Sequence, residues 1–239
     1  NMINVLAEFD NVNLLCGTVN GLYNFNKNNK DFKVIPLRKN EQLLPEFPVT
    51  SLVVDEKKIW VGTEGDGLKL IQGKDVIINY RADSEINVLS DNFVTDIEFE
   101  NNNIWIATQD GLNQIDKISG KLVKIFRSEG TGTIANNNLT SLFADSKERL
   151  WIGTDYGGLC LFDKNDQMFM LINKAAGLTN NSIKSITEDN QGNIWVTSDG
   201  LLYKIATKKF QIPYQIKDLD ITSFSSSDGL TLGQFSYNC

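Results

Sequence analysis

The string IWVGT at residues 59–63 decides the fold, because close copies of it recur along the whole chain. The copies read IWIAT at 104–108, LWIGT at 150–154 and IWVTS at 194–198, and a weaker version, LLCGT, stands at 14–18. The intervals from Leu15 through the tryptophans are 45, 45, 46 and 44 residues, the tryptophans being Trp60, Trp105, Trp151 and Trp195. A period of about 45 residues in a strand-rich chain is typical of β-propeller blades. The repeat therefore predicts an all-β propeller.

Each repeat is expected to contain four antiparallel strands separated by short polar turns. The first strands are predicted at 3–8, 49–54, 94–99, 139–144 and 183–188, and an acidic residue stands at or just after the end of each. The tryptophan string is the second strand, and a Gly-Leu pair opens the third. These pairs begin at Gly21, Gly67, Gly111, Gly158 and Gly200.

The tryptophan strand is predicted to lie in the middle of each blade. Blades stack face to face, so both faces of this strand are buried, which explains why the string is apolar at consecutive positions. A buried Trp removes roughly 150–250 Å² from water, or about 4–6 kcal/mol per blade interface. The glycine before each Leu is expected to adopt a turn conformation that a Cβ would penalise. The repeat's structural residues are thus the four tryptophans and Gly67, Gly111, Gly158 and Gly200.

The repeats divide the chain into five units, at about 1–44, 45–89, 90–134, 135–178 and 179–234. The regular spacing between linker and first strand also predicts that 235–239 is the first strand of a truncated sixth repeat. We therefore expect a fragment of a larger propeller array. Five blades of a larger ring leave two uncovered faces. An open arc, a strained closure of five blades and pairing between chains are all compatible with the sequence.

Composition excludes several classes of function. The net charge of −7 makes nucleic acid a poor partner, and without a run of 18 apolar residues no membrane contact by this segment is expected. Histidine is absent, which removes the commonest general base and metal ligand. The spacing of Cys16, Cys160 and Cys239 fits neither a zinc site nor a disulfide scaffold. No catalytic residue, metal or cofactor is expected.

Candidate ligand-binding residues gather on one predicted face. The turns between second and third strands open there together with the linkers, and propellers most often bind ligands on this face. The turns would present Glu64, Asp66, Gln109, Asp110, Asp155, Tyr156 and Asp199. Carboxylates and amides can pair with sugar hydroxyls, and Tyr156 offers a ring for a sugar face. Short turns also favour Asp and Asn for structural reasons, and the regular placement of linker residues Asn92, Asn137 and Asn181 favours a structural role.

The combination of V-x-x-I-x-x-D, IWVGT-like strings and Gly-Leu pairs at this period resembles the two-component regulator propeller repeat. The resemblance covers essentially the whole chain. It implies the periplasmic sensor half of a hybrid two-component system of Bacteroides-type bacteria, in which the propellers precede an immunoglobulin-like domain, one membrane helix and a histidine kinase. Such sensors recognise glycans. The resemblance thus implies an oligosaccharide ligand, and any kinase activity would belong to parts of the parent protein outside this chain.

Three functional hypotheses follow. The first is a non-catalytic periplasmic sensor module that binds an oligosaccharide and whose parent is anchored in the inner membrane. The second is a scaffold or homodimerisation surface with no small ligand. The third is an enzyme, because streptogramin lyases are propellers with similar repeats. Those lyases rely on a histidine base and a bound metal, so the absence of histidine disfavours the third hypothesis.

Overall fold

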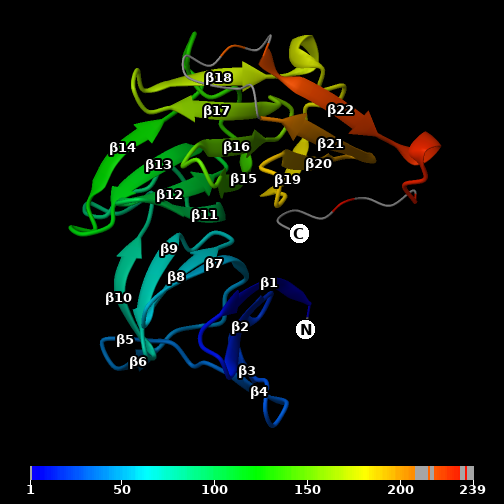
Figure 1. The fold of residues 1–239 in the computed structure, drawn as a ribbon. Helices are drawn as coiled ribbons and strands as arrows, with labels where there is room; N and C mark the ends of the chain where they lie inside the picture. Colours follow the sequence, from blue (N-terminus) through cyan, green and yellow to red (C-terminus); the bar gives the residue numbers. More distant parts are fainter. Residues whose placement is uncertain (1, 208–214, 216–217, 232–234, 236–239) are drawn as a thin grey trace.

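A computed structural model describes residues 2–207, 215, 218–231 and 235, and it shows an all-β protein built of five antiparallel sheets (Figure 1). The first sheet contains β1 (Ile3–Glu8), β2 (Asn13–Thr18), β3 (Gly21–Asn26) and β4 (Asp31–Val34). The third contains β11 (Val94–Glu100), β12 (Asn103–Thr108), β13 (Gly111–Asp116) and β14 (Leu122–Phe126). The fourth contains β15 (Leu139–Ala144), β16 (Leu150–Thr154), β17 (Leu159–Asp163) and β18 (Met168–Ile172). The fifth contains β19 (Ile183–Glu188), β20 (Ile194–Ser198), β21 (Leu201–Ala206) and β22 (Asp220–Phe224).

The second sheet is wider than the others. Its blade strands are β7 (Val49–Asp55), β8 (Lys58–Thr63), β9 (Leu68–Gln72) and β10 (Asp75–Tyr80). A short hairpin of β5 (Arg38–Lys39) and β6 (Gln42–Leu43) joins its outer edge through a parallel pairing of Arg38 with Asp75. The sequence analysis did not predict this hairpin. The predicted strand at 235–239 lies outside the described residues apart from Phe235, as does Cys239.

The five sheets follow one another in an arc, from β1–β4 at one end to β19–β22 at the other (Figure 1). Neighbouring sheets meet through their first strands, with β1 against β7, β7 against β11, β11 against β15 and β15 against β19. At the β1 end, Met2, Ile3 and Leu6 are 68%, 48% and 57% exposed. The described sheets of this single chain therefore form an open arc, and pairing between chains stays a prediction.

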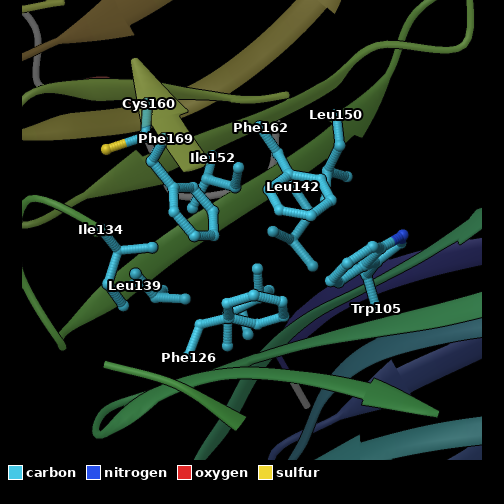
Figure 2. Close-up of a cluster of buried hydrophobic side chains, with 12 residues drawn as sticks. Trp105, Phe126, Ile134, Leu139, Leu142, Leu150, Ile152, Cys160, Phe162 and Phe169 are labelled. Carbon is cyan, nitrogen blue, oxygen red and sulfur yellow. The ribbon is translucent and has the colours of Figure 1, made fainter. Parts of the chain in front are cut away.

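Tryptophan side chains fill the interfaces between consecutive sheets. Trp60, Trp105 and Trp151 are 3%, 1% and 0% exposed, and each packs against the first and second strands of the following sheet. Figure 2 shows one interface, where Trp105 and Phe126 of the third sheet face Leu142, Leu150 and Phe162 of the fourth. The Trp105 and Phe162 rings meet edge to face, with their centroids 5.2 Å apart.

Trp195 differs from the predicted arrangement. It is only partly buried, because no further sheet among the described residues covers its face of the fifth blade. Its ring stacks instead on Phe224 of its own sheet, with the centroids 5.9 Å apart, and the Lys204 ammonium group lies 5.6 Å from the ring centroid. The burial of a repeat tryptophan therefore depends on the next blade.

The acidic residue that follows each first strand has a structural explanation. In three sheets its carboxylate accepts a hydrogen bond from the indole N–H of the same repeat: Trp105 bonds to Glu100 (3.3 Å), Trp151 to Asp145 (2.8 Å) and Trp195 to Asp189 (2.8 Å). Each bond satisfies the polar atom of the ring and fixes the ring's orientation. In the second sheet Asp55 pairs with Lys117 at 2.8 Å instead. Within the described part of the chain, the Trp60 indole nitrogen has no partner.

Two kinds of glycine let neighbouring backbone segments approach closely. Gly111, in a Gly-Leu pair, has a φ of +124°, and a Cβ there would lie 2.6 Å from the carbonyl oxygen of Phe126. Gly153, inside the tryptophan string, faces the next sheet, where a Cβ would lie 2.7 Å from Cγ2 of Ile183. The first glycine permits a left-handed turn, and the second permits close packing of two sheets.

We expect Trp105→Ala to lower the free energy of unfolding by about 3–5 kcal/mol, because it leaves a cavity between two sheets. Trp195→Ala should cost clearly less, since that ring is already partly in water. Urea denaturation of the two variants and the wild type, followed by circular dichroism, measures both effects. Equal losses in the two variants would contradict the inter-blade role of the buried ring.

Candidate ligand-binding site

A cavity of about 590 Å³ opens where the first strands of four sheets begin. Four first strands converge on it, and the turns and linkers of the third and fourth sheets add to its rim. It is lined by Met2, Ile3, Asn4, Thr50, Phe93, Thr95, Gln109, Asn138, Leu139, Thr140 and Asp155. The cavity therefore lies at the axis of the arc, on the face where the sequence predicts ligand binding.

A β-bulge lies at the second residue of every first strand. The pairing register with the second strand shifts there, and the residues at the shifts are Asn4, Thr50, Thr95, Thr140 and Lys184. A bulge re-aims its side chain, and the first four of these residues line the cavity. The repeated bulge thus surrounds the axis with amide and hydroxyl groups.

Some of these polar groups already form hydrogen bonds within the chain. The Asn4 amide donates to the carbonyl oxygen of Val49 at 2.9 Å, and the Thr50 hydroxyl donates to that of Val94 at 2.6 Å. Both bonds join one first strand to the next. Thr140 is different, because its hydroxyl is buried, with the residue 5% exposed, and has no hydrogen-bond partner among the described residues. Thr140 thus lacks the bond to the next strand that Thr50 makes.

Two of the seven turn residues predicted from the sequence line this cavity, Gln109 and Asp155. Gln109 is exposed and is held in place by a backbone hydrogen bond to Phe93 (3.2 Å). The Asp155 carboxylate accepts hydrogen bonds from the Ser182 hydroxyl at 2.8 Å and from the Asn138 amide at 3.4 Å. These two bonds orient the carboxylate at the rim.

The other predicted carboxylates lie outside the cavity lining. Glu64 is exposed on its turn. The remaining three form ion pairs with cations of their own blades: Asp66 with Lys69 (2.6 Å) and with Arg81, Asp110 with Arg127 (3.1 Å), and Asp199 with Lys184 (3.4 Å). Ion pairing gives Asp66, Asp110 and Asp199 a local structural role that their turn positions alone did not reveal.

The linker asparagines have structural bonds as well. The carbonyl oxygens of Asn92 and Asn137 each accept a 2.9 Å hydrogen bond from the Gly-Leu glycine of the preceding blade, Gly67 and Gly111 respectively. Their side-chain oxygens accept from the backbone N–H groups of Ala82 (2.8 Å) and Ser128 (2.7 Å). Their regular spacing reflects this connection between blade and linker.

Tyr156 follows Asp155 on the same turn, and its side chain is 76% exposed. Its φ of +68° is left-handed, a conformation that costs a non-glycine residue roughly 1–2 kcal/mol. The corresponding turn of the second blade is 63–67. In both turns the first residue, a threonine, donates hydrogen bonds from its backbone N–H and its hydroxyl to the carbonyl oxygen of the fifth residue. The second blade has Gly65 where the fourth has Tyr156, and the φ of Gly65 is +94°. The fourth blade therefore keeps a strained, exposed aromatic ring where glycine would suit the backbone better.

The sequence pattern did not reveal a pair of partly buried carboxyl groups on β11. Burial raises the pKa of Asp96 to about 7, and burial together with the charge of Asp96 raises that of Glu98 to about 8. Asp96 accepts a hydrogen bond at 2.8 Å from the backbone N–H of Leu142 in the next sheet. Three of the other blades carry serine at the third residue of the same strand, and the first blade carries Val5, so comparing the repeats position by position could have found Asp96. The serines are Ser51, Ser141 and Ser185.

Two segments, 133–156 and 177–200, match the profile of the two-component regulator propeller. These two parts of the chain are thus similar to the two-component regulator propeller. The matched segments contain Asp155 and Tyr156 of the fourth blade and the turn that ends at Gly200. A search of curated proteins by sequence gave no match.

Solved structures similar to this propeller include two from B. thetaiotaomicron. The extracellular domain assigned to the hybrid two-component system BT3049 superimposes with a TM-score of 0.70 and 20% identity, over 99% of this chain and 36% of that one. The extracellular domain assigned to the one-component system BT4673 gives 0.76 and 20%, over 99% and 31%. The β-propeller domain of Cps50 (Swd1) from Myceliophteria thermophila gives 0.63 and 14%, over 92% and 70%. The chain thus shares their fold and spans about a third of the length of the two B. thetaiotaomicron domains.

Two further observations concern the described residues only. No helix in that part of the chain has the length and hydropathy needed to cross a bilayer. No group of three or more acidic or cysteine side chains lies close enough there to hold a metal ion.

We predict that the Asp96 and Glu98 carboxyls make the protein less stable as pH rises. Their pKa values are raised from 3.8 and 4.5 to about 7 and about 8 on folding. Between about pH 4 and 8 the folded protein thus retains protons that the unfolded chain has lost, and the free energy of unfolding falls with increasing pH. At about 1.4 kcal/mol per pKa unit, the loss should be on the order of several kcal/mol.

The test is chemical denaturation at several pH values of the wild type and of the double variant Asp96→Asn/Glu98→Gln. The double variant should have a flatter pH dependence across this window. Glu129→Gln, which changes an exposed carboxylate, serves as the control and should keep the wild-type slope. If the free energy of unfolding of the double variant falls with pH as steeply as that of the wild type, these two carboxyls are not the source of the pH dependence.

Tyr156→Gly should raise the free energy of unfolding by about 1 kcal/mol, because glycine adopts a left-handed conformation without the steric penalty. Thermal and urea denaturation measure the gain. Tyr156→Ala is the matched control, since alanine removes the ring but keeps the Cβ, and it should not be stabilised. A gain of equal size in both variants would mean that the exposed ring, not the backbone, causes the strain.

Proposed function

We propose that this chain is part of a non-catalytic, extracytoplasmic sensor region and that its axial cavity binds an oligosaccharide. The observation that carries the proposal is the cavity of about 590 Å³ at the convergence of four first strands. That volume is within the range of small-ligand sites in proteins, which is about 300–1,000 Å³. It also lies on the turn-and-linker face of the propeller.

The chemistry of the lining supports a sugar ligand. Threonine hydroxyls and the amides of Asn4, Gln109 and Asn138 can both donate and accept hydrogen bonds, as sugar hydroxyls do. The Asp155 carboxylate can accept from two hydroxyl groups. Phe93 in the lining offers an apolar surface for the face of a sugar ring, and the exposed Tyr156, which follows Asp155 on the same turn, offers a second ring. The strain at Tyr156 supports a functional reason for keeping the ring, since strained residues cluster at binding sites.

The remaining parts of this proposal concern the parent protein. The similar B. thetaiotaomicron structures are described as extracellular domains of two-component and one-component systems, and this chain spans about a third of each. We therefore propose that further blades, an immunoglobulin-like domain and a histidine kinase belong to the parent, as in a hybrid two-component system. The kinase would convert ligand binding into a signal. The propeller itself would lie in the periplasm, with the parent anchored in the inner membrane.

A second candidate function is an assembly surface, such as a homodimer interface. Exposed apolar side chains on the first sheet favour it, because Leu6, Phe32 and Val34 are 57%, 42% and 50% exposed. Such a surface needs no small ligand. Sedimentation of the chain over a range of concentrations detects such assembly, and a strictly monomeric chain would contradict it.

The oligosaccharide proposal is tested by isothermal titration of the chain with a panel of plant and host oligosaccharides. We expect Thr140→Val to weaken binding about 3–10-fold without loss of stability, since it removes one unpaired hydroxyl worth about 0.5–1.5 kcal/mol when it bonds to a ligand. Thr50→Val is the matched control: its hydroxyl already bonds to Val94, so it should lower stability more than affinity. No binding by any member of the panel would overturn the proposal.

A further inference from the structure

We infer that the axial cavity selects sugars without negative charge and discriminates against uronic and sulfated sugars. This inference rests on the oligosaccharide site proposed above and specifies which class of sugar that site accepts. It follows from where the charged side chains of the described residues lie and from how each of them is paired.

The cavity lining offers no cation to an anionic ligand. Among the described residues that line it there is no lysine or arginine, and Asp155 is the one ionisable side chain. Proteins recognise carboxylate and sulfate groups with arginine or lysine, often through paired charge-assisted hydrogen bonds. Neutral hydroxyl and amide groups, which dominate this lining, suit sugar hydroxyls instead.

Cations on the same face are already paired. Lys69 and Arg81 bind Asp66, Arg127 binds Asp110, and Lys184 binds Asp199. Lys69 is 2% exposed, so it cannot turn toward a ligand. An anionic sugar could recruit one of these cations only by breaking an ion pair, which would leave a carboxylate without its partner.

Asp155 differs from the carboxylates at the other turns. Its carboxylate accepts hydrogen bonds from neutral groups, the Ser182 hydroxyl and the Asn138 amide, and within the described residues no cation lies at ion-pair distance from it. Its negative charge is therefore not neutralised at the rim. Like charges brought together in a binding site oppose association, and the net charge of −7 adds a repulsive field for an approaching anion.

The test compares uronic-acid oligosaccharides with the same oligosaccharides after carboxyl reduction, which removes the charge and keeps the linkage. Isothermal titration of the chain should show binding of the reduced forms and at least about tenfold weaker binding of the acidic forms, the size of a 1.4 kcal/mol difference. Asp155→Asn should reduce the difference in affinity between the acidic and the reduced oligosaccharides. Asp166→Asn, on the exposed β17–β18 turn at the opposite face, should leave it unchanged.

The outcomes separate the two proposals. If the acidic forms bind as tightly as the reduced forms, or more tightly, the proposed charge selectivity is wrong, while the proposed oligosaccharide site still holds. A difference that persists in full in Asp155→Asn would also overturn it, because Asp155 would not be its source. If neither the acidic nor the reduced forms bind, and the neutral panel does not bind either, then the oligosaccharide site itself fails and the selectivity fails with it.

Discussion

Burial of an indole ring at three of the four interfaces between consecutive described sheets, with Leu15 at the remaining one, is the interaction on which the rest of this structure depends. Trp60, Trp105 and Trp151 are almost inaccessible to water, although each belongs to a sheet that could not cover it alone. Stability is therefore shared between neighbours, as in other repeat proteins. Trp195 is consistent with this dependence, because its ring stays partly exposed where no described sheet follows. The indole–carboxylate bonds of Trp105 and Trp151 add direction to an otherwise non-directional interaction.

The same packing creates the axial cavity. Sheets that stack through wedged side chains fan out around an axis, and their first strands converge there. A bulge at the second residue of each first strand turns one side chain out of the packed core. Such a residue need not be apolar, and the five positions carry one asparagine, three threonines and one lysine. The core thus sets the position of the site, while the chemistry of its lining is free to vary between repeats.

Carboxylates that look alike along the chain have different roles in the folded protein. Asp110 is neutralised by Arg127, which follows the fourth strand of its own blade. Asp155 lines the cavity and has no such cation among the described residues. Asp96 and Glu98 lie in an interface between sheets, where burial raises the pKa of both. Electrostatic roles on this face follow from the pairing of each group, which is a property of the assembled blades.

By itself, the sequence determined the number of complete sheets, the start of every first strand and three of the tryptophans that pack between blades, Trp60, Trp105 and Trp151. These features are local or repeat at a fixed interval, so the apolar pattern and the position of Gly and Trp encode them directly. Only the tertiary structure decided that the five described sheets form an open arc, that Gln109 and Asp155 share a cavity while Asp66 and Asp110 do not, and that Asp96 bonds to the next sheet. Each of these depends on the distance between side chains of different blades, and that distance is set by how the sheets pack around the axis.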